Sequence, residues 1–114
     1  MAIEILTTIR NFSGNNSRPA VVDRFLRREY DVDQTLRLTL SPNVRTTLPF
    51  TFNNVELLYV RCVLGGPVYV YRNLSPEHWT VKDTFFVLGL SDCYKISVKS
   101  DVATTLTIYA AGAD

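Results

Sequence analysis

The only histidine of the chain, His78, lies between an acidic residue, Glu77, and the only tryptophan, Trp79. A histidine beside a carboxylate is typical of acid–base or nucleophilic sites, which also need a nucleophile within reach of the base. Ser75 and Cys93 are candidate nucleophiles, but no motif connects either residue with His78. We therefore interpret His78 as a loop residue, expect Trp79 to pack that loop against a sheet, and predict no enzymatic activity.

Metal and cofactor sites are not indicated either. One histidine and two separated cysteines, Cys62 and Cys93, match no zinc-ligand spacing. The chain has no glycine-rich phosphate loop and no motif of paired carboxylates. We therefore predict no catalytic residue, no metal and no cofactor. The N-terminal segment MAIEILTTIRNF lacks the features of a signal peptide, so we expect free thiols in a protein made in a reducing cytoplasm.

Three tyrosines, Tyr59, Tyr69 and Tyr71, occupy alternating positions in two neighbouring predicted strands. Because alternate strand residues point to the same side of a sheet, these tyrosines are expected to share one face. Such a face can form the centre of a protein interface, or stack on sugar rings or bases. The alternative is that the rings cover the core and their hydroxyl groups reach water.

The densest basic group consists of Arg24, Arg27 and Arg28. Four acidic residues surround it: Asp23, Glu29, Asp31 and Asp33. We therefore interpret this segment as a salt-bridged surface, either solvated or part of an interface, rather than as a phosphate site. The formal net charge of +1 lacks the basic excess of nucleic-acid-binding domains, and no apolar run is long enough to span a bilayer. Neither a nucleic acid nor a membrane is predicted as a partner.

The elements that would position these residues are short stretches of alternating hydrophobicity, separated by turn residues. Alternation with a period of two is typical of strands with one buried face. Strands are predicted on this basis over Ala2–Arg10, Leu36–Leu40, Val44–Phe52, Val55–Val63, Val68–Arg72, Phe85–Leu90, Tyr94–Lys99 and Thr104–Ala110. Pro49 cannot donate a ladder hydrogen bond, so its strand is expected to lie at a sheet edge or to break there.

Three other segments carry different patterns. Asn11–Pro19 is rich in Gly, Asn and Ser, which predicts a surface loop or a mobile arm. Ala20–Tyr30 is interpreted as a strand or a single helical turn, because Val21 and Phe25 are spaced by four. Asn73–Asp83 is predicted to be a polar connection.

About eight short strands with no long helix predict an all-β fold, an antiparallel β-sandwich of jelly-roll-like type or a closed barrel. A length of 114 residues fits a single β-sandwich domain over residues 1–114, with residues 1–19 as an extended N-terminal arm. Such an arm is a candidate for contact with a neighbouring subunit.

The C-terminal half of the chain resembles a class of small bacteriophage virion proteins. The resemblance rests on an ordered series of strand and turn motifs: Leu58-Tyr59-Val60, Gly65-Gly66, Val68-Tyr69-Val70, Phe86-Val87-Leu88-Gly89, Ile96-Ser97-Val98 and Thr105-Leu106-Thr107-Ile108-Tyr109-Ala110-Ala111-Gly112. In that class the proteins decorate the capsid or build tail and head–tail parts, without catalysis. The resemblance therefore implies a structural role in a virion.

From these observations we expect a non-enzymatic virion protein that binds other copies of itself, a major virion protein, or both. The expected interface residues are Arg24, Arg27, Arg28, Tyr59, Tyr69, Tyr71 and Trp79. Short strands with unpaired edges and a terminal arm favour a homo-oligomer. The alternative is a carbohydrate- or receptor-binding β-module that uses the tyrosine-rich face.

Overall fold

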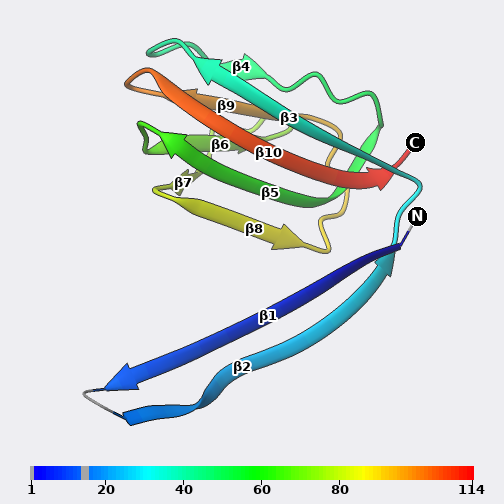
Figure 1. Ribbon diagram of the computed structural model, residues 1–114. Helices are drawn as coiled ribbons and strands as arrows, with labels where there is room; N and C mark the ends of the chain where they lie inside the picture. Colours follow the sequence, from blue (N-terminus) through cyan, green and yellow to red (C-terminus); the bar gives the residue numbers. More distant parts are fainter. Residues whose placement is uncertain (1, 14–15) are drawn as a thin grey trace. The chain divides into compact units, whose positions relative to one another are not determined.

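The computed structural model describes residues 2–13 and 16–114 (Figure 1). The described residues form ten strands and no helix, and every strand pairing is antiparallel. The chain divides into two compact units, Met1–Tyr30 and Asp31–Asp114. The prediction of an all-β, antiparallel fold is therefore confirmed.

The first unit is a two-stranded ribbon. Strand β1 (Ala2–Ser13) pairs with β2 (Asn16–Glu29) from the partners Ala2 and Glu29 to the partners Ser13 and Asn16. The surface loop predicted over Asn11–Pro19 is thus wrong for residues 11–13 and 16–19, which belong to β1 and β2, and residues 14 and 15 lie outside the described residues. Of the two interpretations of Ala20–Tyr30, the strand is confirmed and the single helical turn is wrong, because pairing with β1 continues to Glu29.

The second unit contains two four-stranded sheets (Figure 1). One sheet has the order β3-β10-β5-β8, with bounds Val32–Leu40, Thr104–Ala113, Asn54–Leu64 and Thr84–Leu88. The other has the order β4-β9-β6-β7, with bounds Thr46–Thr47, Ile96–Ser100, Val68–Arg72 and His78–Val81. Apart from the hairpin of β6 and β7, neighbours in each sheet are not consecutive in the chain, so most of the arrangement depends on long-range pairing.

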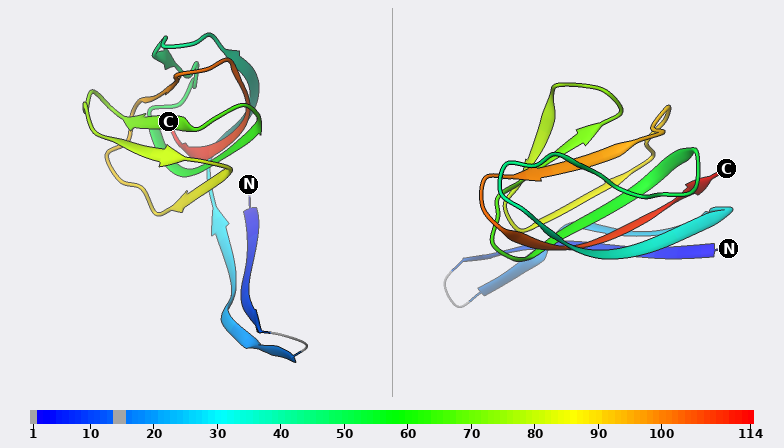
Figure 2. Two further views of the ribbon diagram at one scale, coloured as in Figure 1. Left: turned by 90° about the vertical axis from the view of Figure 1, so that its left-hand side faces the viewer. Right: turned by 90° about the horizontal axis from the view of Figure 1, so that it is seen from above.

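Alternating apolar side chains of both sheets meet in one core. Leu106 and Ile108 of β10 belong to the same buried cluster as Val70 of β6 and Val98 of β9, and all are fully buried. The two sheets therefore face each other across a shared interior, in a β-sandwich-like arrangement (Figure 2). Burial of their apolar side chains is the main stabilising contribution to this unit.

Two elements differ from the sequence-based expectation. The strand predicted over Val44–Phe52 is reduced to Thr46–Thr47, at the edge of its sheet and ending before Pro49, as the missing N–H of proline requires. The polar connection predicted over Asn73–Asp83 is wrong, because it contains β7. Trp79 and Val81 of β7 pair with inward-facing residues of β6, and this burial outweighs the polarity of the surrounding residues.

Candidate functional site

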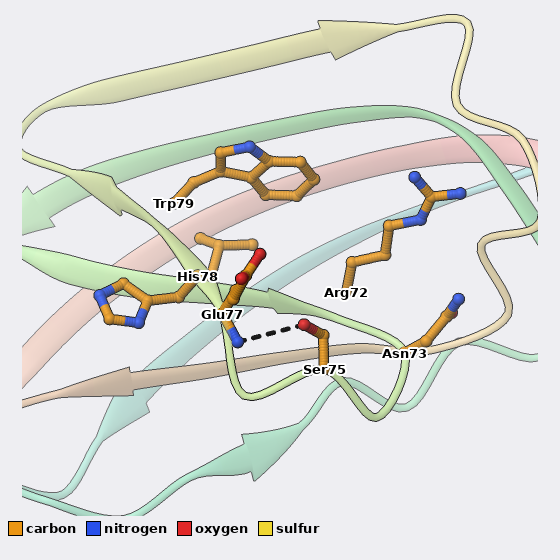
Figure 3. A pocket seen from close by; sticks show the side chains of 7 residues that line it. Arg72, Asn73, Ser75, Glu77, His78 and Trp79 are labelled. Atoms are coloured by element: carbon orange, nitrogen blue, oxygen red, sulfur yellow. Dashed lines mark hydrogen bonds between the residues drawn. The ribbon is translucent and has the colours of Figure 1, made fainter.

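A pocket of about 320 Å³ opens beside the connection between β6 and β7 (Figure 3). All its lining residues come from this one hairpin: Val70, Arg72, Asn73, Ser75, Glu77, His78 and Trp79. We call it the Arg72 pocket. Its volume is at the lower end of the range found for small-molecule sites.

Arg72 extends from the last position of β6 on the side of the sheet that faces the core. It pairs with Ile96, as Val70 pairs with Val98, and directly opposed residues of an antiparallel pair share one face. Ile96 is fully buried, whereas Arg72 is partly exposed at the end of the strand. The Arg72 Nε atom is buried and has no hydrogen-bond partner among the described residues. A guanidinium group is therefore held at the pocket with a donor unused.

Two polar residues of the lining hold the connection in shape. Asn73 adopts a positive φ of 54°, and its Oδ1 accepts hydrogen bonds from the backbone N–H groups of Tyr94 (2.9 Å) and Lys95 (3.3 Å). Its Nδ2 donates to the Asp92 carbonyl at 2.7 Å. Ser75 Oγ accepts a hydrogen bond from the backbone N–H of Glu77 at 3.1 Å. These side chains are engaged within the fold, so the side chains available to a ligand are those of Arg72, Glu77 and Trp79.

Trp79 forms the apolar wall of the pocket. Its indole packs on the ring of Phe85 in the other sheet, with ring centroids 5.0 Å apart and an interplanar angle of 32°. In Figure 3 the Arg72 guanidinium, the Trp79 indole and the Glu77 carboxylate are arranged around the same hollow. The pocket thus combines a cation, an aromatic surface and a hydrogen-bond acceptor.

The His78 ring points away from Ser75, the candidate nucleophile in the same connection (Figure 3). Its ring lies between those of Tyr69 and Tyr71, with centroid separations of 4.6 Å and 5.3 Å. Within the described part of the chain, no hydrogen bond connects His78 with Ser75 or Cys93. Hence the Glu77-His78-Trp79 triplet does not form a nucleophilic triad in this geometry.

The two cysteines are free, Cys93 buried and Cys62 half-buried. Burial raises the pKa of the Cys93 thiol, and the positive charge of Arg72 opposes this effect only in part. Burial, followed by the negative charge of Asp83, raises the pKa of Cys62. Both residues are therefore protonated thiols at neutral pH, the less nucleophilic form. No cluster of three or more metal-ligating side chains exists among the residues described.

The three tyrosines do not share a face, which corrects the sequence-based expectation. Tyr59 belongs to β5 and pairs with Phe86 and Tyr109, whereas Tyr69 and Tyr71 belong to β6 in the other sheet. The period of two gives the side of each strand to which a residue points, but two consecutive strands can belong to different sheets. No continuous platform of these three rings exists.

Tyr69 and Tyr71 instead form a polar and aromatic surface on the outer side of their sheet. The Tyr69 hydroxyl donates a hydrogen bond to Asp101 Oδ2 at 2.8 Å, and this bond raises the pKa of Tyr69. The Arg45 guanidinium lies 3.9 Å from the centre of the Tyr71 ring, and Arg45 Nε donates to Ser97 Oγ at 2.8 Å. The sequence carried no signal for this role of Arg45, which depends on contacts across distant segments.

The basic residues singled out from the sequence lie in the other unit. Arg27 and Arg28 are exposed on β2, where Arg27 is opposite Glu4 and Arg28 is opposite Ile3. Arg24 is opposite Thr7, and its side chain lies outside the described residues. The expected interface residues are thus distributed over both units, with Tyr59, Tyr69, Tyr71 and Trp79 in the second.

Arg72 was missed from the sequence, although a signal for it existed. Val68 and Val70 alternate toward the core, and the same period places Arg72 on their side of the strand. A charged side chain at the end of a strand, on the same side as buried apolar side chains, indicates that the core opens to a polar site there.

Comparison of the chain with protein-family models, with curated proteins and with solved structures finds no match. Over the described ranges, no helix has the length and the apolar character that crossing a bilayer would require.

Proposed function

We propose that the protein is a non-enzymatic structural component of a bacteriophage virion, a capsid decoration or tail/head–tail protein that assembles with copies of itself. The observation that carries this proposal is the ribbon of β1 and β2, which we call the hairpin arm. The contact is made by the hairpin arm of each copy.

The hairpin arm lacks the features that stabilise a sheet by itself. Among the described residues, β1 and β2 pair only with each other, and a two-stranded ribbon is at best marginally stable in water. Leu6 and Phe25 are directly opposite each other on one face, and they are 72% and 60% exposed. Burial of this apolar pair and pairing of the free edges favour association with another chain.

A second copy is the partner that the charges of this face favour. Leu6 and Phe25 are followed on the same face by the opposed pair Glu4 and Arg27, which carry opposite charges. When two such faces pack together about a two-fold axis parallel to the strands, the Glu4 of one copy lies against the Arg27 of the other. A closed symmetric contact requires a surface that is complementary to itself in this way.

The order of strands in the second unit supports the same function. We infer from the orders β3-β10-β5-β8 and β4-β9-β6-β7 that residues 31–114 form a jelly roll. Jelly rolls are common in viral capsid and lectin domains. Since a fold by itself does not determine a function, the hairpin arm remains the deciding feature.

The test is light scattering on a size-exclusion column over a range of protein concentrations. We expect a discrete oligomer that the double substitution Leu6→Asp and Phe25→Asp converts to a monomer. The control is Leu74→Asp, which changes an equally exposed leucine of the second unit (72%) and is expected to leave the oligomer intact. A wild-type chain that stays monomeric, alone and with candidate virion proteins, would refute the proposal.

The competing function is carbohydrate or receptor binding on a face made of Tyr59, Tyr69 and Tyr71. It loses its main support because Tyr59 lies in a different sheet from the other two residues. An unchanged glycan-array signal after Tyr69→Ala would eliminate that surface as the binding site.

A further inference from the structure

We propose that the Arg72 pocket binds a single acidic sugar residue, a hydroxylated ring that carries a carboxylate. Arg72 binds the carboxylate, Glu77 accepts hydrogen bonds from ring hydroxyls, and the Trp79 indole contacts the apolar side of the ring. All the residues that line this site belong to the unit Asp31–Asp114.

The positive charge of Arg72 indicates that the ligand carries a negative group. Its Nε is buried without a hydrogen-bond partner among the described residues, so a ligand in the pocket reaches the guanidinium through the two terminal amino groups. The planar guanidinium presents a fork of N–H donors that matches a carboxylate through two parallel hydrogen bonds. A carboxylate therefore satisfies this group better than a neutral acceptor does.

The Glu77 carboxylate indicates that the ligand also carries hydroxyl groups. An ionised carboxylate only accepts hydrogen bonds, so the ligand must offer donors at this side of the pocket. The same charge repels a compact dianion such as phosphate, which carries its negative charge over its whole surface. A molecule with a carboxylate at one end and hydroxyls at the other meets both conditions.

The Trp79 indole and the volume of the pocket indicate that the ligand contains one sugar ring. The indole is fixed against Phe85, and a rigid aromatic wall favours a ligand with a flat apolar surface, such as the C–H face of a pyranose. The volume of about 320 Å³ accommodates one ring rather than a chain of sugars.

The pocket is also held in its shape before any ligand binds. Asn73 ties the connection to the segment Asp92–Lys95 through three side-chain hydrogen bonds. Little conformational entropy then has to be lost on binding, which favours affinity for a small ligand.

The test uses Trp79 fluorescence, because Trp79 is the only tryptophan in the chain. Glucuronate is the probe, glucose has the same ring without the carboxylate, and acetate has the carboxylate without the ring. We expect saturable quenching by glucuronate and binding at least about tenfold weaker for glucose and for acetate. Absence of a saturable change up to about 10 mM glucuronate, tenfold above a millimolar Kd, would overturn the proposal. If phosphate bound as tightly as glucuronate, the pocket would be a general anion site and the assignment to a sugar would be wrong.

Variants assign the binding to the pocket. We expect Arg72→Gln and Glu77→Ala each to weaken glucuronate binding by about tenfold or more. Arg61→Gln, an exposed arginine on β5 in the other sheet, is the control and should leave binding unchanged. Thermal unfolding of each variant is measured first. If Arg72→Gln does not fold, the test is made with Glu77→Ala, which should fold because Glu77 is exposed and its truncation removes no core contact. Equal affinity of the wild type and a folded Arg72→Gln or Glu77→Ala variant would contradict the assignment.

Discussion

The burial of alternate residues in β10 predicts a large difference between two adjacent substitutions, Ile108→Ala and Thr107→Ala. Ile108 is fully buried between Leu36 of β3 and Val60 of β5, on the core side of its sheet. At roughly 0.8 kcal/mol per buried carbon, Ile108→Ala loses about 2.5 kcal/mol of transfer free energy. The cavity that remains adds to this loss, so we expect a total of about 2–5 kcal/mol.

Thr107 points to the opposite side of the same strand. It is partly exposed and is opposite Arg37 and Arg61, so its truncation removes no core contact. We expect Thr107→Ala to change the free energy of unfolding by less than about 0.5 kcal/mol. The pair is therefore a matched comparison of the two faces at a single point in the sheet.

Thermal and urea unfolding, followed by Trp79 fluorescence, measure the difference. Trp79 belongs to the unit Asp31–Asp114, so its signal reports the unfolding of the unit that contains both substitutions. A loss of 1 kcal/mol lowers the melting temperature of a unit of this size by about 4–8 °C, so Ile108→Ala should melt at least about 8 °C below the wild type. Equal melting temperatures for the two variants would show that the assignment of the buried face of β10 is wrong.

Three further predictions concern other parts of the second unit. Gly112→Ala should destabilise the protein by more than about 1 kcal/mol, because a Cβ atom there would collide with the Asn54 backbone carbonyl; a melting curve that superimposes on that of the wild type would contradict this contact. The raised pKa of buried Cys93 should keep its thiol unreactive toward a disulfide reagent at pH 7.5 in a Cys62→Ser variant, and reaction only after denaturation is the expected result. The folded state binds the Cys93 thiol proton more tightly than the unfolded state does, so the thiol contributes fully to stability below the ordinary pKa of 9.0. This contribution is lost as the pH rises through the higher pKa of the folded state. If the wild type instead gained stability relative to Cys93→Ala across this pH range, the predicted direction of the pKa shift would be wrong.

Much of the strand content was predictable because the alternation of apolar residues is a local signal. The segments predicted over Val55–Val63, Val68–Arg72 and Thr104–Ala110 correspond to β5, β6 and β10, and their predicted apolar faces contain Val60, Val70 and Ile108 of the core. The prediction of a break near Pro49 is also confirmed, since proline lacks the N–H that a ladder needs.

The errors occurred where pairing with the neighbouring strand of a hairpin outweighed local composition. Asn11–Pro19 has the composition of a loop, yet most of it is extended because β1 and β2 pair along their length. The strand β7 is embedded in polar residues, and pairing with β6 and burial of Trp79 and Val81 explain its formation.

The sequence by itself determined the period of each strand, and with it the side to which each residue points, because that side depends only on the backbone geometry of neighbouring residues. Only the tertiary structure decided which strands are neighbours. That choice depends on burying the apolar faces of all strands at once. It separates Tyr59 from Tyr69 and Tyr71, and it places the Arg72 guanidinium beside the indole of Trp79 at the opening of the core.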